Sequence, residues 1–139
     1  MQRPIMTTVS FLRRPSRAAT LDDIHIAQDL VDTLDANRER CVGMAANMIG
    51  ESVCIIAVVD EDLGGRITTM LNPQITTQDG AYETQEGCLS LQGERSTLRY
   101  RRIEVSWQDI RGRARHAAFT GGTAEAIQHE VDHTLGIII

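Results

Sequence analysis

The sequence predicts an α+β fold in one domain, residues 1–139, with small antiparallel sheets around a central metal-binding helix. Three observations support this prediction. Residues 21–40 have the apolar spacing of an amphipathic helix, several later segments resemble strands, and the last segment places two histidines four residues apart. A chain of this length can bury about two thirds of its extended surface, which is enough for a core without disulfides.

The first expected helix covers residues 21–40. Its apolar residues have the i, i+3, i+4 spacing of a helix that packs one face against a core: Ile24, Ala27, Val31 and Leu34. Thr20 and Asp22 are suited to begin this helix, because short polar side chains accept hydrogen bonds from the free amides of a first turn.

Four segments are expected to be strands. Residues 52–59 are rich in β-branched side chains, and residues 67–71 form a second strand that ends at Asn72-Pro73. Residues 102–108 alternate apolar and polar side chains. With residues 113–119 and the turn between them they predict a hairpin.

The last expected helix opens at Gly121 and carries His129 and His133. Residues four apart lie on the same face of a helix, so both imidazoles can reach one metal ion. Glu130 is rotated by about 100° from His129, which suits a general base rather than a ligand. The alternative is a pair of hydrogen-bonded core histidines.

This helix is also expected to run through the middle of the fold with both faces covered. The side chains that lie nearly opposite His129 are Ile127, Val131 and Leu135. His25 and His116 have no comparable context and are expected at the surface or as capping residues.

A catalytic metal of this kind usually takes three protein ligands and leaves a fourth position for water. The third ligand must therefore come from a cysteine, another histidine or a carboxylate. Cys88 is distinctive because it lies within Glu86-Gly87-Cys88-Leu89-Ser90. Cys54, in the apolar run 53–59, is expected to be an inert buried thiol. The sequence does not decide whether Cys41 is a ligand.

Two motifs carry a resemblance to a known family. Glu86-Gly87-Cys88-Leu89-Ser90 and Gln128-His129-Glu130-Val131-Asp132-His133 resemble, in that order, the second and third signature motifs of peptide deformylases, which remove the N-formyl group from nascent bacterial polypeptides. The resemblance extends from about Ile5 to Ile139. The first family motif is glycine, any residue, glycine, any residue, two alanines, any residue and glutamine; it corresponds to Cys41-Val42-Gly43-Met44-Ala45-Ala46-Asn47-Met48. Cys41 replaces its first glycine and Met48 its glutamine.

The resemblance implies an amide hydrolase that acts on N-formylmethionyl peptides with one divalent metal ion. Its ligands would be Cys88, His129 and His133. The family implies Fe²⁺ in vivo, and Zn²⁺, Ni²⁺ or Co²⁺ suit the same ligands. Glu130 would take a proton from the water and return it to the leaving amine. The backbone N–H of Leu89 would donate to the developing oxyanion.

The resemblance also implies the substrate contacts. Gly43 would pair with the substrate main chain, and Val42 and Leu89 would flank the methionine pocket. The family takes its second oxyanion donor from the glutamine of the first motif. Met48 has nothing to donate, and Asn47 is expected to fix a turn rather than to replace that donor.

Several supporting residues are expected around this site. Glu86 and Arg99 would form a partly buried pair that fixes the loop carrying Cys88. Asp132 would either orient a ligand imidazole or bond to neighbouring backbone. Glu125, one turn before His129, is expected to be solvated; if it lines the mouth of the site, it would disfavour acidic substrates.

The composition excludes other classes of protein. The net charge of −5, with no lysine among fourteen basic residues, argues against a general nucleic-acid binder. Two short arginine runs, within 95–102 and 111–115, are expected to be solvated strand faces, with a phosphate contact or a transient ribosome contact as the alternative. The run 53–59 is too short to span a membrane. Three cysteines and no signal peptide indicate a reducing cytoplasm.

Two further functions stay open at this point. One is a divergent relative with weak activity or another acyl amide as its substrate, which Met48 favours. The other is a metal-binding protein that no longer catalyses. Glu130 argues against the latter, because a structural metal site needs no base beside a water position.

Overall fold

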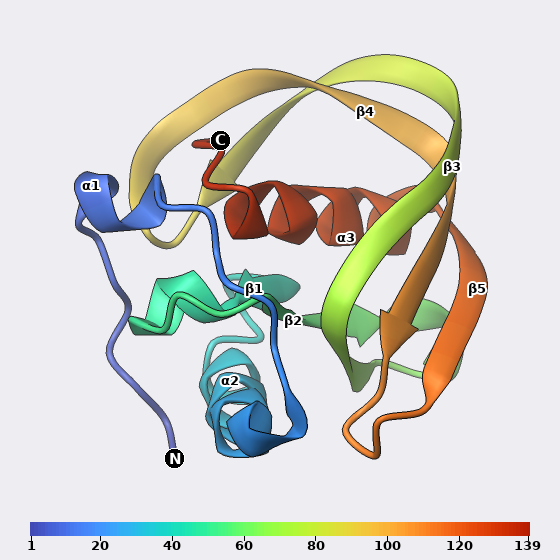
Figure 1. The fold of residues 1–139 in the computed structure, drawn as a ribbon. Helices are drawn as coiled ribbons and strands as arrows, with labels where there is room; N and C mark the ends of the chain where they lie inside the picture. The colour runs from blue at the N-terminus through green and yellow to red at the C-terminus, as the bar shows by residue number, and fades with distance from the viewer.

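The computed structural model describes all 139 residues and confirms the α+β class (Figure 1). One five-stranded antiparallel sheet has the order β1-β2-β3-β4-β5. The expected small sheets are therefore parts of one sheet, which curves around helix α3. The elements are α1 (Val9–Leu12), α2 (Ile24–Ala36), β1 (Gly43–Ala45), β2 (Ile55–Asp60), β3 (Arg66–Cys88), β4 (Leu91–Gln108), β5 (Ala114–Thr120) and α3 (Gly121–Thr134), with 3₁₀ turns at Leu21–Asp23, Ala46–Ile49 and Glu61–Leu63.

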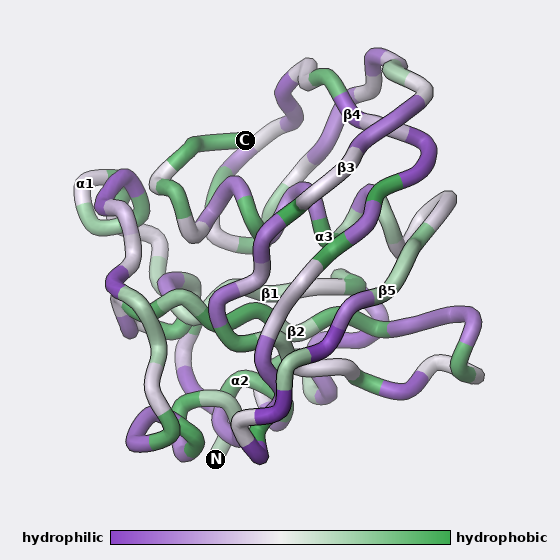
Figure 2. Tube along the Cα trace, turned by 45° about the vertical axis from the view of Figure 1, so that its right-hand side comes forward, coloured by the Kyte–Doolittle hydropathy of each residue, from purple (hydrophilic) through white to green (hydrophobic).

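Strand β2 lies between the two long helices, and all six of its residues are buried. One face, with Ile55 and Ala57, packs against α2, and the other, with Ile56 and Val58, packs against α3. A strand covered on both faces is apolar throughout rather than alternating. This agrees with the expected strand at 52–59, and Figure 2 shows β2 in the hydrophobic colours.

The chain becomes helical where the sequence indicates, but as a 3₁₀ turn at Leu21–Asp23 that leads into α2 at Ile24. Thr20 and Asp23 form a capping box at the start of this turn, and Arg17 donates to both oxygens of Asp23. The α-helix ends at Ala36 rather than at residue 40. The chain then turns through residues 37–42 into β1, which brings this segment to the rim of the site.

Strands β3 and β4 are much longer than predicted, and they arch over α3 in Figure 1. The expectation that the second strand ends at Asn72-Pro73 was wrong. Asn72 has a positive φ of 52°, and the register shifts between Leu71 and Gln74. This bulge accommodates Pro73 without ending the strand. The hairpin of residues 102–108 and 113–119 is confirmed by the pairing of β4 with β5.

Helix α3 occupies the hollow of the sheet. His129, Glu130 and His133 are buried on one side of it, and Ile127 is fully buried in the core. Leu135 does not cover the opposite face as expected: it follows the end of the helix and is 59% exposed. No helix of the structure is long and apolar enough to cross a membrane.

Candidate active site

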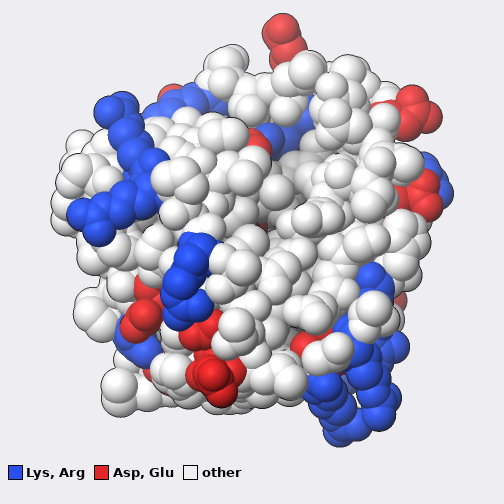
Figure 3. All heavy atoms as spheres, viewed as in Figure 1, with Lys and Arg blue, Asp and Glu red and all other residues white.

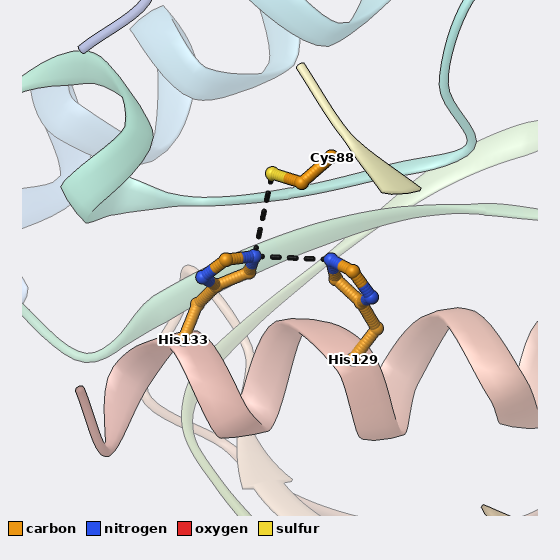
Figure 4. A group of neighbouring side chains, drawn as sticks. All are labelled: Cys88, His129 and His133. Atoms are coloured by element: carbon orange, nitrogen blue, oxygen red, sulfur yellow. Dashed lines mark hydrogen bonds between the residues drawn. The ribbon is translucent and has the colours of Figure 1, made fainter. Parts of the chain in front are cut away.

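Three side chains converge in the hollow of the sheet (Figure 4). His129 and His133 lie one turn apart on α3, and Cys88 reaches them from the end of β3. The two Nε2 atoms are 3.0 Å apart, and Sγ of Cys88 is 3.5 Å from Nε2 of His133. These three atoms all lie within 4.8 Å of one another. The structure thus brings together the three residues that the sequence suggested as ligands.

The spacing of these atoms fits one metal ion. Tetrahedral bonds of about 2.0–2.1 Å to nitrogen and about 2.3 Å to sulfur would separate two nitrogens by about 3.3 Å and nitrogen from sulfur by about 3.6 Å. The distances of 3.0 Å between the nitrogens and 3.5 Å between Sγ of Cys88 and Nε2 of His133 are close to these values. One thiolate and two imidazoles are donors that several divalent transition metals accept, so the donor set alone selects none of them.

Glu86 and Arg99 lie behind the three candidate ligands as a buried ion pair. Nε of Arg99 donates to both carboxylate oxygens of Glu86, at 3.1 and 2.9 Å, and Nη2 donates at 2.7 Å. Nδ1 of His129 lies 2.8 Å from Oε1 of Glu86. A proton held on Nδ1 by this carboxylate leaves the Nε2 lone pair free for a metal. Burial opposes ionisation of Glu86, but the hydrogen bonds from His129 and Arg99 lower its pKa to about 2.

Asp132 also belongs to this network, in a role that the sequence did not suggest. Its Oδ2 accepts from Nη1 of Arg99 at 2.7 Å. It is therefore bonded neither to a ligand imidazole nor to local backbone, the two roles considered above. Arg99 thereby ties the C-terminal half of α3 to the strand that carries Cys88.

The surroundings of the two imidazoles favour positive charge between them. Burial lowers the pKa of His129, but Glu130, Cys88 and Glu86 outweigh it and raise the pKa to about 10. Burial and the neighbouring His129 lower the pKa of His133 to about 3. At neutral pH the pair therefore carries one positive charge, on His129. A divalent cation would supply positive charge in the same place, in agreement with the fit of the ligand distances.

Glu130 is a buried carboxylate beside the ligands. Burial raises its pKa to about 7, against the opposing effect of His129. Its Oε1 has no hydrogen-bond partner, which is unusual for a buried carboxylate oxygen. A carboxylate whose pKa lies near the working pH and whose oxygen is free suits proton transfer.

Gly43 sets the space for this carboxylate. A Cβ atom at Gly43 would lie 2.9 Å from Oε2 of Glu130, 3.1 Å from its Cγ and 3.3 Å from Cγ1 of Val58. Strand β1 is an edge of the sheet, so its outer side is free to pair with an extended peptide. Glycine at this position allows β1 and Glu130 to approach each other closely.

We expect Gly43→Ala to lower the kcat/KM of hydrolysis by about 100-fold, because a displacement of about 1 Å in a catalytic group costs about this much. Metal content should stay at the wild-type level, since none of the three ligands is displaced. Steady-state rates and metal analysis of the same preparation measure both effects. An unchanged kcat/KM would mean that Glu130 moves aside without cost.

A cleft of about 730 Å³ opens over these residues. It is lined by Val42, Gly43, Met48 and Leu89, which are the residues expected at the substrate. Val42 is 50% exposed and offers an apolar surface at the rim. Figure 3 shows the arginines of one face in separate groups.

The amide of Asn47 points away from the cleft. Its Nδ2 donates to the backbone oxygen of His133 at 2.9 Å and to that of Leu12 at 3.5 Å. Asn47 therefore anchors the end of α3 to α1, rather than only fixing its own turn. Its amide nitrogen is thus engaged in the core, as expected for a residue that does not replace the family's glutamine. Met48, beside it, is buried and lines the cleft.

The remaining cysteines and histidines lie outside the ligand group. Cys54 is a half-buried free thiol whose pKa is raised by burial. Cys41 lines the cleft, and burial together with the charges of Glu130 and Cys88 raises its pKa to about 11, so it stays a thiol. His25 and His116 are exposed, as expected.

Glu125 is not simply solvated, contrary to the first expectation. It lines the cleft and is only partly exposed. Its Oε1 accepts a hydrogen bond from the hydroxyl of Tyr82 at 3.2 Å. Burial and the neighbouring carboxylate of Glu86 raise the pKa of Glu125. No sequence signal pointed to Tyr82, because it lies 43 residues away on the outer part of β3.

Comparisons with known proteins agree with this site. The family model described as polypeptide deformylase matches residues 3–139. The chain is 46% identical over its full length to a peptide deformylase of Clostridium beijerinckii, all of which it covers. It is 38% identical over 116 residues to a peptide deformylase of Dictyoglomus turgidum, and the aligned segment covers 83% of this chain and 72% of that relative.

Solved structures show the same fold. The crystal structure of peptide deformylase from Thermus thermophilus superposes with a TM-score of 0.85 and 34% identity, over 99% of this chain and 83% of that one. A peptide deformylase from Legionella pneumophila gives a TM-score of 0.86 and 29% identity, with the same two coverages. Because both the sequence and the fold match over almost the entire chain, this protein belongs to the polypeptide deformylase family.

Proposed function

We propose that this protein removes the N-formyl group from N-formylmethionyl peptides. The observation that carries the proposal is the convergence of Cys88, His129 and His133 beside the buried carboxylate of Glu130. Three ligands and a neighbouring base form the arrangement of a metal-assisted hydrolase. The position of these groups at the edge strand β1 suits a peptide substrate.

The reaction assigns a role to each group. The bound metal would supply Lewis acidity, which makes water a proton donor near neutral pH and polarises the formyl oxygen. Glu130 accepts the proton of the attacking water and returns it to the leaving amine. The backbone N–H of Leu89 stabilises the developing oxyanion. Gly43 pairs with the substrate main chain, and Val42 and Leu89 contact the methionine side chain.

The setting of the reaction is also part of the proposal. One divalent metal is held per chain, with Fe²⁺ in vivo and with Zn²⁺, Ni²⁺ or Co²⁺ as substitutes that the same ligands accept. Formylated nascent peptides are made in the cytoplasm, and a transient ribosome contact would bring the protein to them. The Glu86–Arg99 pair keeps the loop of Cys88 in place.

The decisive test compares two substrates on protein of defined metal content. A formyl-Met peptide should be hydrolysed, and the matching acetyl-Met peptide should react much more slowly. The opposite preference would favour a relative that acts on another acyl amide. If neither peptide reacted with the fully metal-loaded protein, the remaining alternative would be a metal-binding protein without catalysis, despite the base at Glu130.

Met48 occupies the position where the family carries the glutamine that donates to the oxyanion. We expect Met48→Gln to raise kcat on a formyl-Met peptide by about 10-fold or more, with less change in KM, because the restored bond is strongest in the transition state. The gain should fall short of the full value of about 10²–10³ for one donor. Met48 is buried in the core, so a glutamine must fit where a thioether packs.

The matched control is Met48→Leu, which changes the side chain without adding a donor and should not raise kcat. Cys41→Gly combined with Met48→Gln restores more of the family loop and tests whether a misaimed amide limits the gain. Asn47 is left in place, because its bond to His133 anchors α3. If Met48→Gln slowed an enzyme that already turned over at about 10 s⁻¹, the second donor would have to come from elsewhere.

A further inference from the structure

The N-terminal half of α3 forms one wall of the cleft. Gly122, Glu125, Ala126, His129 and Glu130 line it. Their spacing of three or four residues places them along one face of the helix. Gly122 and Ala126 are small, so Glu125 is the only long side chain on this wall before the ligand His129. About one helical turn, or about 5.4 Å along the axis, separates Glu125 from His129.

Glu125 has no cationic partner. The hydroxyl of Tyr82 is its hydrogen-bond donor, at 3.2 Å. Arg101 stacks over the ring of Tyr82, with Cζ 4.9 Å from the ring centre, and forms no ion pair with Glu125. Arg99 is already bound by Glu86 and Asp132. The α3 wall therefore presents the carboxyl of Glu125 beside that of Glu86, whereas the arginines of the cleft, Arg38 and Arg40, belong to the segment before β1. A cation from outside the protein would complement the charge on this wall.

The proposed reaction places the substrate beside this carboxylate. The formyl group must lie next to Cys88, His129 and Glu130, which puts the formylated residue at the same point of the cleft. Along α3 the cleft continues only toward Glu125, Ala126 and Gly122. A side chain as long as methionine or lysine spans about one helical turn. Its end therefore reaches the level of Glu125.

We propose that Glu125 is a specificity-determining residue, which makes the cleft prefer a formylated residue whose side chain ends in a cation or hydrogen-bond donor over one that ends in a carboxylate. The inference rests on the proposed deformylase function. Methionine has a neutral end and serves as the reference side chain. A cation gains attraction from Glu125, and a carboxylate meets repulsion that the partly buried setting strengthens. Tyr82 is a positioning residue, because its hydroxyl holds Glu125 in the cleft.

The test uses three peptides that differ only in the formylated residue: formyl-Lys, formyl-Met and formyl-Glu followed by the same two neutral residues. For the wild-type protein, kcat/KM should be higher for formyl-Lys than for formyl-Glu by about 100-fold. Glu125→Gln should reduce this ratio by about 10-fold or more. The change should appear mainly in KM, because the charge contact is made equally in the bound substrate and in the transition state. Formyl-Met, whose side chain ends without a charge, is the reference substrate to which both charged peptides are compared.

Two further variants and a binding measurement separate charge from structure. Tyr82→Phe should lower the Lys to Glu ratio by less than Glu125→Gln does. Glu83→Gln removes the same charge from an exposed position of β3 outside the cleft and should leave the ratio unchanged. The affinities of the deformylated Lys and Glu peptides, measured by calorimetry, should follow the same order, and 1 M salt should reduce the difference.

Two results would overturn the inference in distinguishable ways. If Glu125→Gln hydrolysed the formyl peptides but kept the wild-type Lys to Glu ratio, Glu125 would have no part in specificity and the deformylase function would stand. If the metal-loaded wild-type protein hydrolysed none of the three formyl peptides, the proposed function itself would fail and the inference with it.

Discussion

Glu130→Gln is expected to keep the metal but to lose nearly all hydrolysis of a formyl-Met peptide. Glutamine preserves the shape of the side chain and removes the proton acceptor. General acid–base catalysis contributes about 10²–10⁴ in rate, so kcat should fall by a factor in this range. The side chain is buried with a free Oε1, which leaves little room for a solvent base to take its place. Rates and metal content measured on one preparation test both parts.

An exposed carboxylate distant from the cleft gives the matched control. Glu61→Gln, in the turn after β2, makes the same chemical change and should keep the full rate. If Glu130→Gln lost its metal as completely as a histidine variant, Glu130 would be a ligand rather than a base. An unchanged kcat would show that another group accepts the proton.

Two of the three candidate metal ligands could be proposed from the sequence because their spacing is local. Two histidines four residues apart meet on any regular helix, so His129 and His133 needed no tertiary information. Cys88 lies 45 residues from His133, and no periodicity connects the two. It became a candidate only through its flanking residues, which resemble a family motif.

The partners that surround the ligands could not be predicted in the same way. Arg99 and Asp132 are 33 residues apart, and Asn47 reaches the backbone of His133 across 86 residues. Such contacts depend on how the sheet curves around α3, which the local sequence does not encode. Asp132 and Asn47 were noticed for their places in the motifs, but their partners followed only from the fold.

The long strands β3 and β4 were missed for a different reason. Prediction from alternation needs one buried face, and residues 76–85 of β3 are exposed or only partly buried on both faces. Side chains on both faces of this stretch are largely polar, so its sequence lacks the alternation of a strand and resembles that of a loop. Pro73 and Asn72 reinforced that interpretation, although the bulge at Asn72 lets the strand continue.

Cys88→Ala, His129→Ala and His133→Ala are each expected to abolish stoichiometric metal binding and, with it, measurable hydrolysis. Each change leaves two ligands, and structural or catalytic sites of this type need at least three from the protein. Metal analysis after dialysis against a weak chelator gives the stoichiometry. Thermal unfolding gives a second readout: metal bound only to the folded state raises its stability, so added metal should raise the Tm of the wild type and not that of the variants.

Cys54→Ala is the control for the cysteine, because Cys54 is a half-buried thiol outside the ligand group, and it should retain one metal per chain. His116→Ala, at an exposed position, serves the same purpose for the histidines. If Cys88→Ala kept its full metal content, Cys88 would not be a ligand, and another side chain would have to be the third ligand beside the two imidazoles. Glu130 would then be the candidate, and Glu130→Gln would be expected to lose its metal. The two variants therefore test one assignment from both sides: metal should be lost without the thiolate and kept without the base.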